Sequence, residues 1–456
     1  MRNFLFLALG FGILNLGACA GLDAEAGWVK EGPLTRMVPS NRSLLEAGEK
    51  AQDHGLENAG KSLTLREAIR LALTHNDQLR AEARKVRAWE HRRLQEGRWA
   101  NPVLEVAAED WLGSSNFEGV DQIQITAQFS QDFDIGGKRS ARSTVAAHER
   151  DAAGWALELA RLALWHRTAL SFADVLVAQR ELTISQEEIE LANQSNAVFQ
   201  AQSEAGRVAG MEVERAQIGV ALAQLNLQAT QLELERARQK LASCWGAPVA
   251  HFGTVAGEMK NDTQVPSIEV LMAGLDQHPR IKLQQMNLDV ERARVEAARA
   301  EGVPDLSFIL GYRYFNEPGD SALVAGLALP VPLFDRNQDA VDAAHQDVSA
   351  AQDKLRAAKA SMGNFLTRAS GRLRSAQQAA KVLAGQVLPQ AEKTFQSMKE
   401  GARIGRFGYL DLLDAQRTLF RVKRQSLQAK AEAYKAQMDL EYFLAKPMAS
   451  PPEGAK

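Results

Sequence analysis

The sequence is poor in cysteines, which form disulfides, and in long apolar stretches, which form membrane-spanning helices. It holds only 2 cysteines in 456 residues, Cys19 and Cys244. Beyond residue 18, no apolar stretch approaches the roughly 20 residues that a membrane-spanning helix needs. If the chain crosses a membrane, it must do so with β-strands closed into a barrel, because open strand edges are not tolerated in lipid.

Motifs for chemistry are also missing. There is no glycine-rich phosphate loop, zinc-protease helix motif or nucleophile elbow, so nothing indicates an enzyme or a cofactor. The 8 histidines form no ligand cluster in the sequence, and the 10 methionines are scattered, so we predict no metal site. The net charge is −2, and no basic stripe with interleaved aromatic residues is present, which excludes nucleic acid as an expected partner.

The first residues have the pattern of a bacterial lipoprotein signal. Arg2 precedes an apolar run from 4 to 14, and the box Leu-Gly-Ala-Cys ends at Cys19. We predict a signal peptide at 1–18 and lipidation of Cys19. Ala20, in place of an aspartate, favours the outer membrane by resemblance to other lipoproteins. The alternative is an ordinary secretory signal with a chance cysteine. With Cys19 lipidated, Cys244 has no disulfide partner and is expected to fill apolar space.

The chain repeats one plan at a spacing of about 200 residues, and such a period indicates architecture before any local pattern does. The matched pairs include Asn101-Pro102 with Val303-Pro304, Phe133-Asp134 with Phe334-Asp335, and Ala216-Gln217 with Ala415-Gln416. We predict two structural repeats, 64–246 and 267–445, joined by a mid-belt connector at 247–266. A lipid-anchored extension at 19–63 precedes them, and a tail at 446–456 follows.

Each repeat holds two segments with the two-residue period of β-strands. In the first repeat the apolar positions are Leu104, Val106 and Ala108, then Ile123, Ile125, Ala127 and Phe129. In the second repeat they are Leu306, Phe308, Leu310, Tyr312 and Tyr314, then Leu323, Ala325, Leu327, Leu329 and Val331. Four strands cannot close a barrel alone, so several chains are expected to share one. A small soluble sheet is the simpler alternative.

Helices of unusual length follow each strand pair. No proline occurs from 137 to 205, and a helix of that length would span ~100 Å. Its apolar positions fall at coiled-coil spacing, which predicts a packing seam: Ala152, Trp155, Leu159, Leu162, His166, Ala169, Ala173 and Leu176. The return helices, near 213–244 and 412–443, keep a 3-4 apolar spacing that indicates supercoiled partners. They cover only ~50 Å, so the connector is expected at mid-height.

These features together resemble the TolC-like outer-membrane factors, and the resemblance covers about 62 to 446. It implies a mainly α fold with a small β part: an internally duplicated, trimeric α-helical barrel continuous with a shared twelve-stranded transmembrane β-barrel, with four strands per chain. It also implies a set of partners: outer-membrane lipid, a periplasmic adaptor (membrane fusion protein) and an inner-membrane RND-type pump.

Two strings resemble the heavy-metal, CzcC-type branch of that family. They are Phe-Asp-Ile-Gly-Gly-Lys-Arg at 133–139 and Pro-Val-Pro-Leu-Phe-Asp-Arg-Asn-Gln at 330–338. The branch implies passive conduction of heavy-metal cations. A structural reading also exists, because glycine and proline suit junctions where strand becomes helix.

The resemblance also nominates site residues. Two turns near 206–210 and 401–408 are expected to form the periplasmic tip, where glycines allow the reversal and arginines dock the adaptor: Gly206, Arg207, Gly210, Gly401, Arg403, Gly405 and Arg406. A further glycine, Gly408, is expected in the second turn. In TolC-like proteins, aspartates at the positions of Asp411 and Asp414 ring the periplasmic entrance, and Glu212 is the equivalent of Asp411 in the first repeat. Their simpler role is to stabilise helix N-termini.

Two rival functions remain open. The same duct could carry drugs, other organic solutes or secreted proteins, and only the two branch strings separate that reading from metal efflux. A protein of another class, a lipid-anchored periplasmic coiled-coil scaffold, would need the long helices but not the alternating strand pairs.

Overall fold

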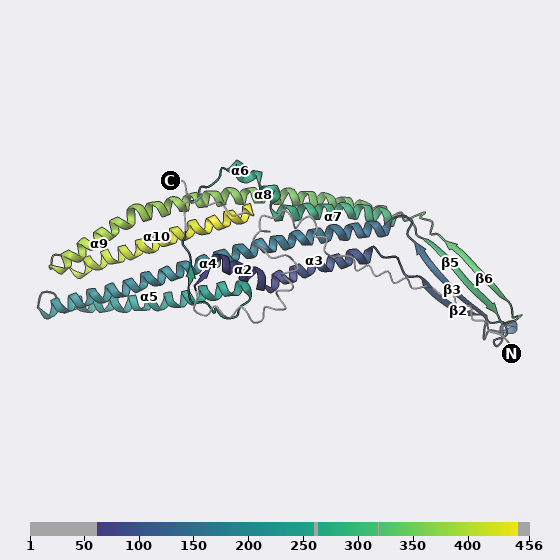
Figure 1. Ribbon diagram of the computed structural model, residues 1–456, viewed down its shortest axis with the longest axis horizontal. Helices are drawn as coiled ribbons and strands as arrows, with labels where there is room; N and C mark the ends of the chain where they lie inside the picture. Colours follow the sequence, from purple (N-terminus) through teal and green to yellow (C-terminus); the bar gives the residue numbers. More distant parts are fainter. Residues whose placement is uncertain (1–61, 260–262, 318, 446–456) are drawn as a thin grey trace.

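The chain forms a long rod with strands at one end and two helical hairpins at the other (Figure 1). In this computed structural model the described residues are 62–259, 263–317 and 319–445. The predicted signal peptide, the lipidation site Cys19 and the tail 446–456 lie outside the described residues.

The two halves of the chain run through similar elements in the same order. The first half contains β1 (Leu63–Thr64), α2 (Leu65–His75), α3 (Asp77–Glu96), β2 (Val103–Glu109), η2 (Ser115–Phe117), β3 (Gln124–Phe133), α4 (Lys138–Glu204), α5 (Gly210–Ala242) and η3 (Ser243–Trp245). The connector contains β4 (Val255–Ala256). The second half contains α6 (Ile268–Ala273), η4 (Leu275–Gln277), α7 (Pro279–Glu301), β5 (Leu306–Phe315), β6 (Ser321–Ala328), α8 (Gln338–Val382), η5 (Leu383–Val387), α9 (Leu388–Arg403) and α10 (Tyr409–Leu444).

The four long strands form one antiparallel sheet in the order β2-β3-β5-β6. All four predicted strands are present, but β6 is shorter than expected. It ends at Ala328, so Leu329 and Val331 lie beyond the sheet. The reason is that Pro330 and Pro332 have no backbone N–H to donate to a neighbouring strand. A separate parallel pair, β1 with β4, ties the start of the first half to the connector.

Helix α4 is unbroken over 67 residues, which corresponds to about 100 Å. It packs against α2, α3, α5, α7 and α10. The predicted seam is largely buried, because Leu162, Ala169 and Ala173 are at most 1% exposed. Mid-height residues on other sides of the helix are buried as well. Phe172 and Val175, which lie outside the predicted seam, are fully buried.

The corresponding helix of the second half is interrupted. A π-helical turn, Leu383–Val387, separates α8 from α9, and Pro389 lies in the first turn of α9. Proline removes a backbone donor and its ring crowds the preceding turn, so a widened turn ahead of it relieves the clash. The second outward helix thus bends at mid-height, where α4 runs on without a break (Figure 1).

Buried clusters join the halves at two heights. Near the hairpin ends, Phe199 of α4 and Phe395 of α9 share one cluster with Tyr409 of α10. At mid-height Ala169 and Ala173 of α4 pack with Met438 of α10. Cys244 is a buried free thiol in a third cluster, which confirms its predicted role as apolar filler.

Candidate functional site

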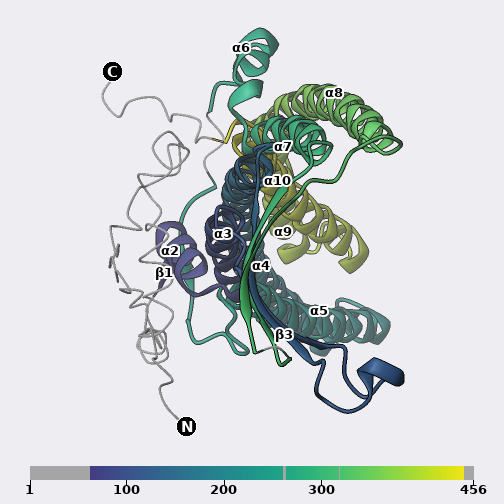
Figure 2. The same cartoon turned by 90° about the vertical axis from the view of Figure 1, so that its right-hand side faces the viewer.

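The chain curves like a wall when viewed along its length (Figure 2). Its elements keep one lateral order in the sheet, the adjoining helices and the hairpins. In the sheet the order is β2-β3-β5-β6. In the adjoining helices it is α3-α4-α7-α8, and in the hairpins it is α5-α4-α10-α9. At each level the first half supplies one edge and the second half supplies the other. Within the described part of the chain, no element packs extensively on the outer side of either edge.

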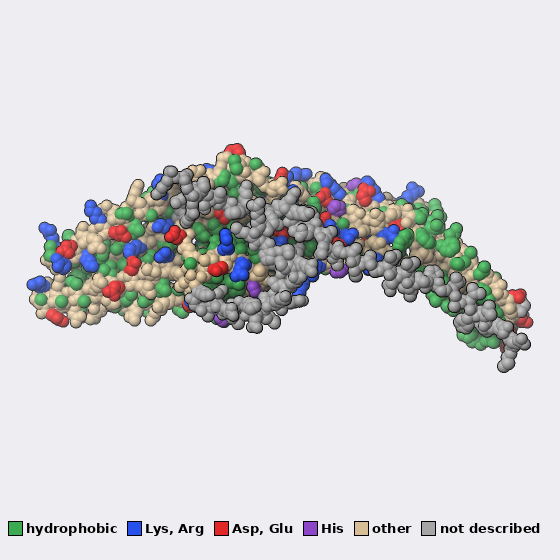
Figure 3. Space-filling model, viewed as in Figure 1, with side chains coloured by type: hydrophobic (Ala, Val, Ile, Leu, Met, Phe, Trp, Pro, Cys, Tyr) green, Lys and Arg blue, Asp and Glu red, His purple; other side chains and the backbone are tan. Residues whose placement is uncertain are grey.

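The sheet has two chemically different faces. Rows of apolar side chains cross all four strands on one face: Leu104 is opposite Phe129, which is opposite Leu310. Many of these side chains are exposed, including Val106, Phe308, Tyr312, Leu323 and Leu327. Figure 3 shows hydrophobic side chains gathered over this end of the rod. An apolar surface of this kind indicates a contact with another protein or with lipid.

The opposite face of the sheet is polar and internally hydrogen-bonded. Gln128 donates to Glu105 across 2.8 Å, and Arg313 donates to the hydroxyl of Thr126 across 2.9 Å. Gly311 is required in this sheet, because a Cβ there would lie 2.6 Å from the Cβ of Gln128. The sheet thus separates a polar side from an apolar side. Among the described helices, none is both long and apolar enough to cross a membrane.

A series of ion pairs connects α4 of the first half to α10 of the second. Lys423 contacts Glu187 at 2.5 Å, and Arg424 contacts Glu188 at 2.5 Å. Further along α4 from the hairpin ends, Asp174 forms ion pairs with both Lys240 and Lys435. Burial acts to raise the pKa of Asp174, but the hydrogen bonds from the two lysines outweigh it and hold that pKa below its usual range. Sequence patterns gave no signal for these pairs, because the partners are far apart in the chain.

His166, a predicted seam residue, belongs to the same interface. Its Nε2 lies 2.8 Å from a carboxylate oxygen of Asp439. Arg372, the position where the repeat replaces an apolar residue by a charged one, pairs with Asp439 and with Glu432. The charged residue therefore serves a contact between α8 and α10, which explains the departure from the apolar pattern.

Two equivalent side chains fasten the helices at mid-height. Asn76 accepts from the backbone of Leu79 at the start of α3 and donates to the backbone oxygen of Cys244. His278, its counterpart in the repeat, accepts a hydrogen bond at Nδ1 from the backbone of Arg280. Burial lowers the pKa of His278 to about 4, so the ring is neutral at ordinary pH.

The tip turns lie where the sequence predicts, between α4 and α5 and between α9 and α10, but only two of the glycines make the reversal. Gly206 and Gly405 have positive φ values of 67° and 74°. Gly210 is the first residue of α5. Gly408 caps α10 in an extended conformation. Gly401 lies inside α9 for another reason: a Cβ there would meet the ring of Phe407 at 2.3 Å.

The tip arginines differ in their surroundings. Arg403 pairs with Glu400 one turn earlier at 2.8 Å. Arg207 and Arg406 are exposed and form no ion pair with another described residue. These two side chains are therefore free to meet a partner's acidic groups.

The nominated entrance acids are not gathered into one cluster within a single chain. Asp411 accepts a hydrogen bond from the backbone N–H of Gly408 and so caps α10. Asp414 is exposed one turn further along. Glu212 pairs with Arg215 at 3.1 Å, and its Oε2 is buried without a hydrogen bond in the described part. Asp411 thus caps α10 within a single chain.

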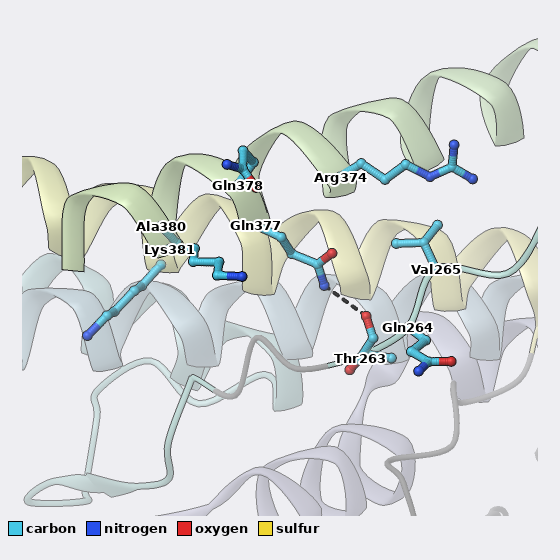
Figure 4. A pocket seen from close by; sticks show the side chains of 9 residues that line it. Thr263, Gln264, Val265, Arg374, Gln377, Gln378, Ala380 and Lys381 are labelled. Carbon is cyan, nitrogen blue, oxygen red and sulfur yellow. Dashed lines mark hydrogen bonds between the residues drawn. The ribbon is translucent and has the colours of Figure 1, made fainter. Parts of the chain in front are cut away.

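A cleft of about 820 Å³ lies at mid-height between α8, α10 and the connector. Gln377 reaches across it to the backbone oxygen of Thr263, 2.9 Å away (Figure 4). Its charged lining residues are all cations: Arg374, Lys381 and Lys430. Such a cleft repels metal cations. Across the described ranges, no group of three or more histidine, cysteine or acidic side chains is arranged to hold a metal ion.

Comparison with known proteins decides the family. The model of the outer membrane efflux protein family matches residues 68–247 and 271–445. The chain belongs to this family. Outer membrane efflux proteins are channel proteins of the outer membrane that extend into the periplasm. The apolar face of the sheet fits the membrane part of such a protein, and the long hairpins fit the periplasmic part. The resemblance to TolC-like factors read from the repeats is confirmed.

Two relatives of this outer membrane efflux protein carry names that refer to metals. The chain is 31% identical to the cobalt-zinc-cadmium resistance protein CzcC of Cupriavidus metallidurans over 85% of this chain and 91% of that protein. It is 28% identical to the nickel-cobalt-cadmium resistance protein NccC of Alcaligenes xylosoxydans xylosoxydans, over 64% of this chain and 65% of that protein. The resemblance to the heavy-metal branch is confirmed.

Among solved structures, CusC has the same fold as this outer membrane efflux protein. The TM-score is 0.73 at 19% identity, over 87% of this chain and 95% of CusC. The predicted fold class, mainly helical with a small β part, is confirmed by this likeness. The crystal structures of CusC concern the conformational changes that accompany its folding and transmembrane channel formation.

Proposed function

We propose that three copies of this chain close into one duct that conducts heavy-metal cations passively through the outer membrane. The observation that carries the proposal is the open-edged wall, with the same lateral order in the sheet, the adjoining helices and the hairpins. Because the two edges of the wall differ, one copy can place its first edge against the second edge of the next copy. When this contact is repeated by a rotation axis, the copies close into a ring. The twelve shared strands would form the transmembrane β-barrel and leave no strand edge in lipid.

The faces of the sheet support this arrangement. Its exposed apolar residues, such as Phe129 and Leu310, would face lipid, and the polar face with Arg313 and Glu105 would line the aqueous interior. The repeats 64–246 and 267–445 would each supply one sixth of the ring, with 247–266 as a belt at mid-height. Lipidation of Cys19 would add an anchor beside the barrel.

The hairpin ends support a docking role. The exposed Arg207 and Arg406 would contact a periplasmic adaptor, which connects the duct to an inner-membrane RND-type pump. In the ring, Asp411 and Asp414 of three copies would face one narrow entrance, with Glu212 beside them, and would favour cations there. The duct itself would catalyse no reaction and hold no cofactor.

A metal-tolerance experiment tests the cargo. Deletion of the gene should lower the tolerance of the host to zinc, cobalt or cadmium and leave its tolerance to dyes and detergents unchanged. Plasmid-borne wild-type protein should restore metal tolerance. Loss of dye tolerance alone would favour the organic-solute duct, and a secretion defect alone would favour protein export. The coiled-coil scaffold is disfavoured by the apolar face of the sheet, which a soluble scaffold would leave in water.

A further inference from the structure

The two free edges of the helical wall carry opposite charge. On the edge formed by α3, Arg84, Arg87 and Arg98 are exposed, and His91 lies among them. Their spacing of three, four and seven residues places them along one side of the helix and just past its end. An adjoining side of α3, with Leu79, Ala83 and Val86, is buried. None of the three arginines forms an ion pair with another described residue, so we call this surface the basic edge.

On the edge formed by α8, the exposed side is acidic. Asp339, Asp342 and Asp353 are exposed and share one side of the helix. The side that packs on α7 carries small and apolar residues instead: Val341, Ala344, Val348 and Ala351. Asp353 contacts Arg356 on its own helix, whereas Asp339 and Asp342 form no ion pair elsewhere in the described part. We call this surface the acidic edge.

Ion pairs between α4 and α7 show how charged side chains are paired inside the wall. Arg142 of α4 meets Glu301 of α7 at 3.1 Å, and Glu149 of α4 meets Arg294 of α7 at 2.6 Å. These pairs set an antiparallel register between the two halves of one chain. The unpaired charges of the outer edges are thus an exception to the pattern of this wall.

The internal repeat predicts the register between α8 of one copy and α3 of the next. Helix α8 follows β6 as α4 follows β3, and α3 precedes β2 as α7 precedes β5. A copy that continues the wall would therefore set its α3 against α8 in the register of α4 and α7. That register places Asp342 level with Arg98 of the neighbouring copy. It also places Asp353 within about one helical turn of Arg87 of that copy.

We propose that the basic edge of one copy docks on the acidic edge of the next through ion pairs, and that this charge pattern fixes the order of assembly. The inference rests on the proposed ring and adds its chemistry. Two basic edges repel each other, as do two acidic edges, so only the head-to-tail contact is favourable. The occupant of each edge is a second copy of this chain, and neither edge is complete without it.

Charge reversal tests the contact. The acidic-edge variant combines Asp342→Lys with Asp353→Lys, and the basic-edge variant combines Arg87→Glu with Arg98→Glu. Asp347→Lys and Lys85→Glu are controls, because these exposed residues lie on other sides of α8 and α3. Lys85 pairs with Glu82 of its own helix. Each full-length protein is purified in detergent at low salt, its helix content is checked by circular dichroism, and its trimer fraction is measured by native mass spectrometry.

Each edge variant should give a roughly tenfold or greater loss of trimer, because like charges then face each other. The four-residue combination should restore most of the trimer, since every pair between copies is reversed and only the pair of Asp353 with Arg356 within α8 is lost. The controls should match wild type. Wild-type trimer that persists in both edge variants, or a combination with no recovery, would overturn the ion-pair contact. Wild-type protein that is itself monomeric would overturn the proposed ring instead.

Discussion

His278 donates a hydrogen bond from Nε2 to the backbone oxygen of Tyr442 across 3.2 Å. The contact joins the N-cap residue of α7 to the last turn of α10. The other ring nitrogen accepts the backbone N–H of Arg280 at 3.1 Å and caps α7. Both contacts together require the neutral ring, because a protonated Nδ1 cannot accept.

Acid should therefore weaken the protein through His278. Burial lowers its pKa from 6.5 to about 4, so below pH 6.5 the unfolded chain takes up a proton that the folded chain refuses. The contribution to stability is complete above pH 6.5 and falls as the pH drops towards 4, by about 3 kcal/mol in total. Guanidinium unfolding of the detergent-solubilised protein, followed at pH values from 7.5 to 4, measures this loss.

The equivalent joint of the first half supplies a matched variant. Asn76 makes the same two kinds of contact without a titrating group, so His278→Asn should keep the joint and flatten the acid dependence. His91→Asn, at an exposed site on α3, is the control and should keep the wild-type slope. An unchanged slope in His278→Asn would show that other groups cause the acid sensitivity.

The tip glycines should respond unequally to alanine. Gly401→Ala forces a Cβ against the Phe407 ring and should loosen the turn strongly. Gly405→Ala meets no atom but must adopt a φ of 74°, which costs about 1 kcal/mol. Gly210→Ala, with open space and no positive φ, is the control. Hydrogen exchange at 402–410 measures the loosening, and equal exchange in all three variants would refute this account of the turn.

Lipidation of Cys19 should anchor the duct without being needed to build it. The reason is that the proposed barrel, and not the lipid, holds the trimer in the membrane. A Cys19→Ser protein behind a cleavable signal should still form trimers that need detergent for extraction. Recovery of that protein as a soluble monomer would contradict the barrel assignment.

The entrance acids should affect ion selectivity more than stability. Asp411→Asn keeps an acceptor for the backbone N–H of Gly408, so α10 should remain capped. The double variant Asp411→Asn, Asp414→Asn should nevertheless lose at least roughly threefold of its cation preference, because the carboxylates no longer attract cations. Single-channel recording with and without a trivalent cation is the measurement. Undiminished selectivity and block would leave only the capping role.

Much of the fold follows from local periodicity. Ile125 and Phe129 alternate with glutamine and threonine, and that alternation alone predicts the strand and its two faces. The repeat predicts the second half from the first. The periodicity does not predict the bend ahead of α9, for which Gly385 and Pro389 are the only sequence signal.

The contacts between distant segments could not be predicted from the sequence. Asn76 and His278 are matched by the repeat, but their backbone partners are 168 and 164 residues away. The ion pairs between α4 and α10 are hidden for the same reason, because charged residues such as Glu188 and Arg424 look like ordinary solvated positions. Local patterns carry no information on which distant charge a side chain meets.

Current through purified wild-type protein in planar bilayers tests the central claim most directly. Under a salt gradient, trimers should insert as discrete conductance steps, and the reversal potential should have the sign of a cation-selective channel. Detergent-matched protein that gives no steps, or steps that favour anions, would contradict the account of this chain as a cation-conducting outer-membrane duct.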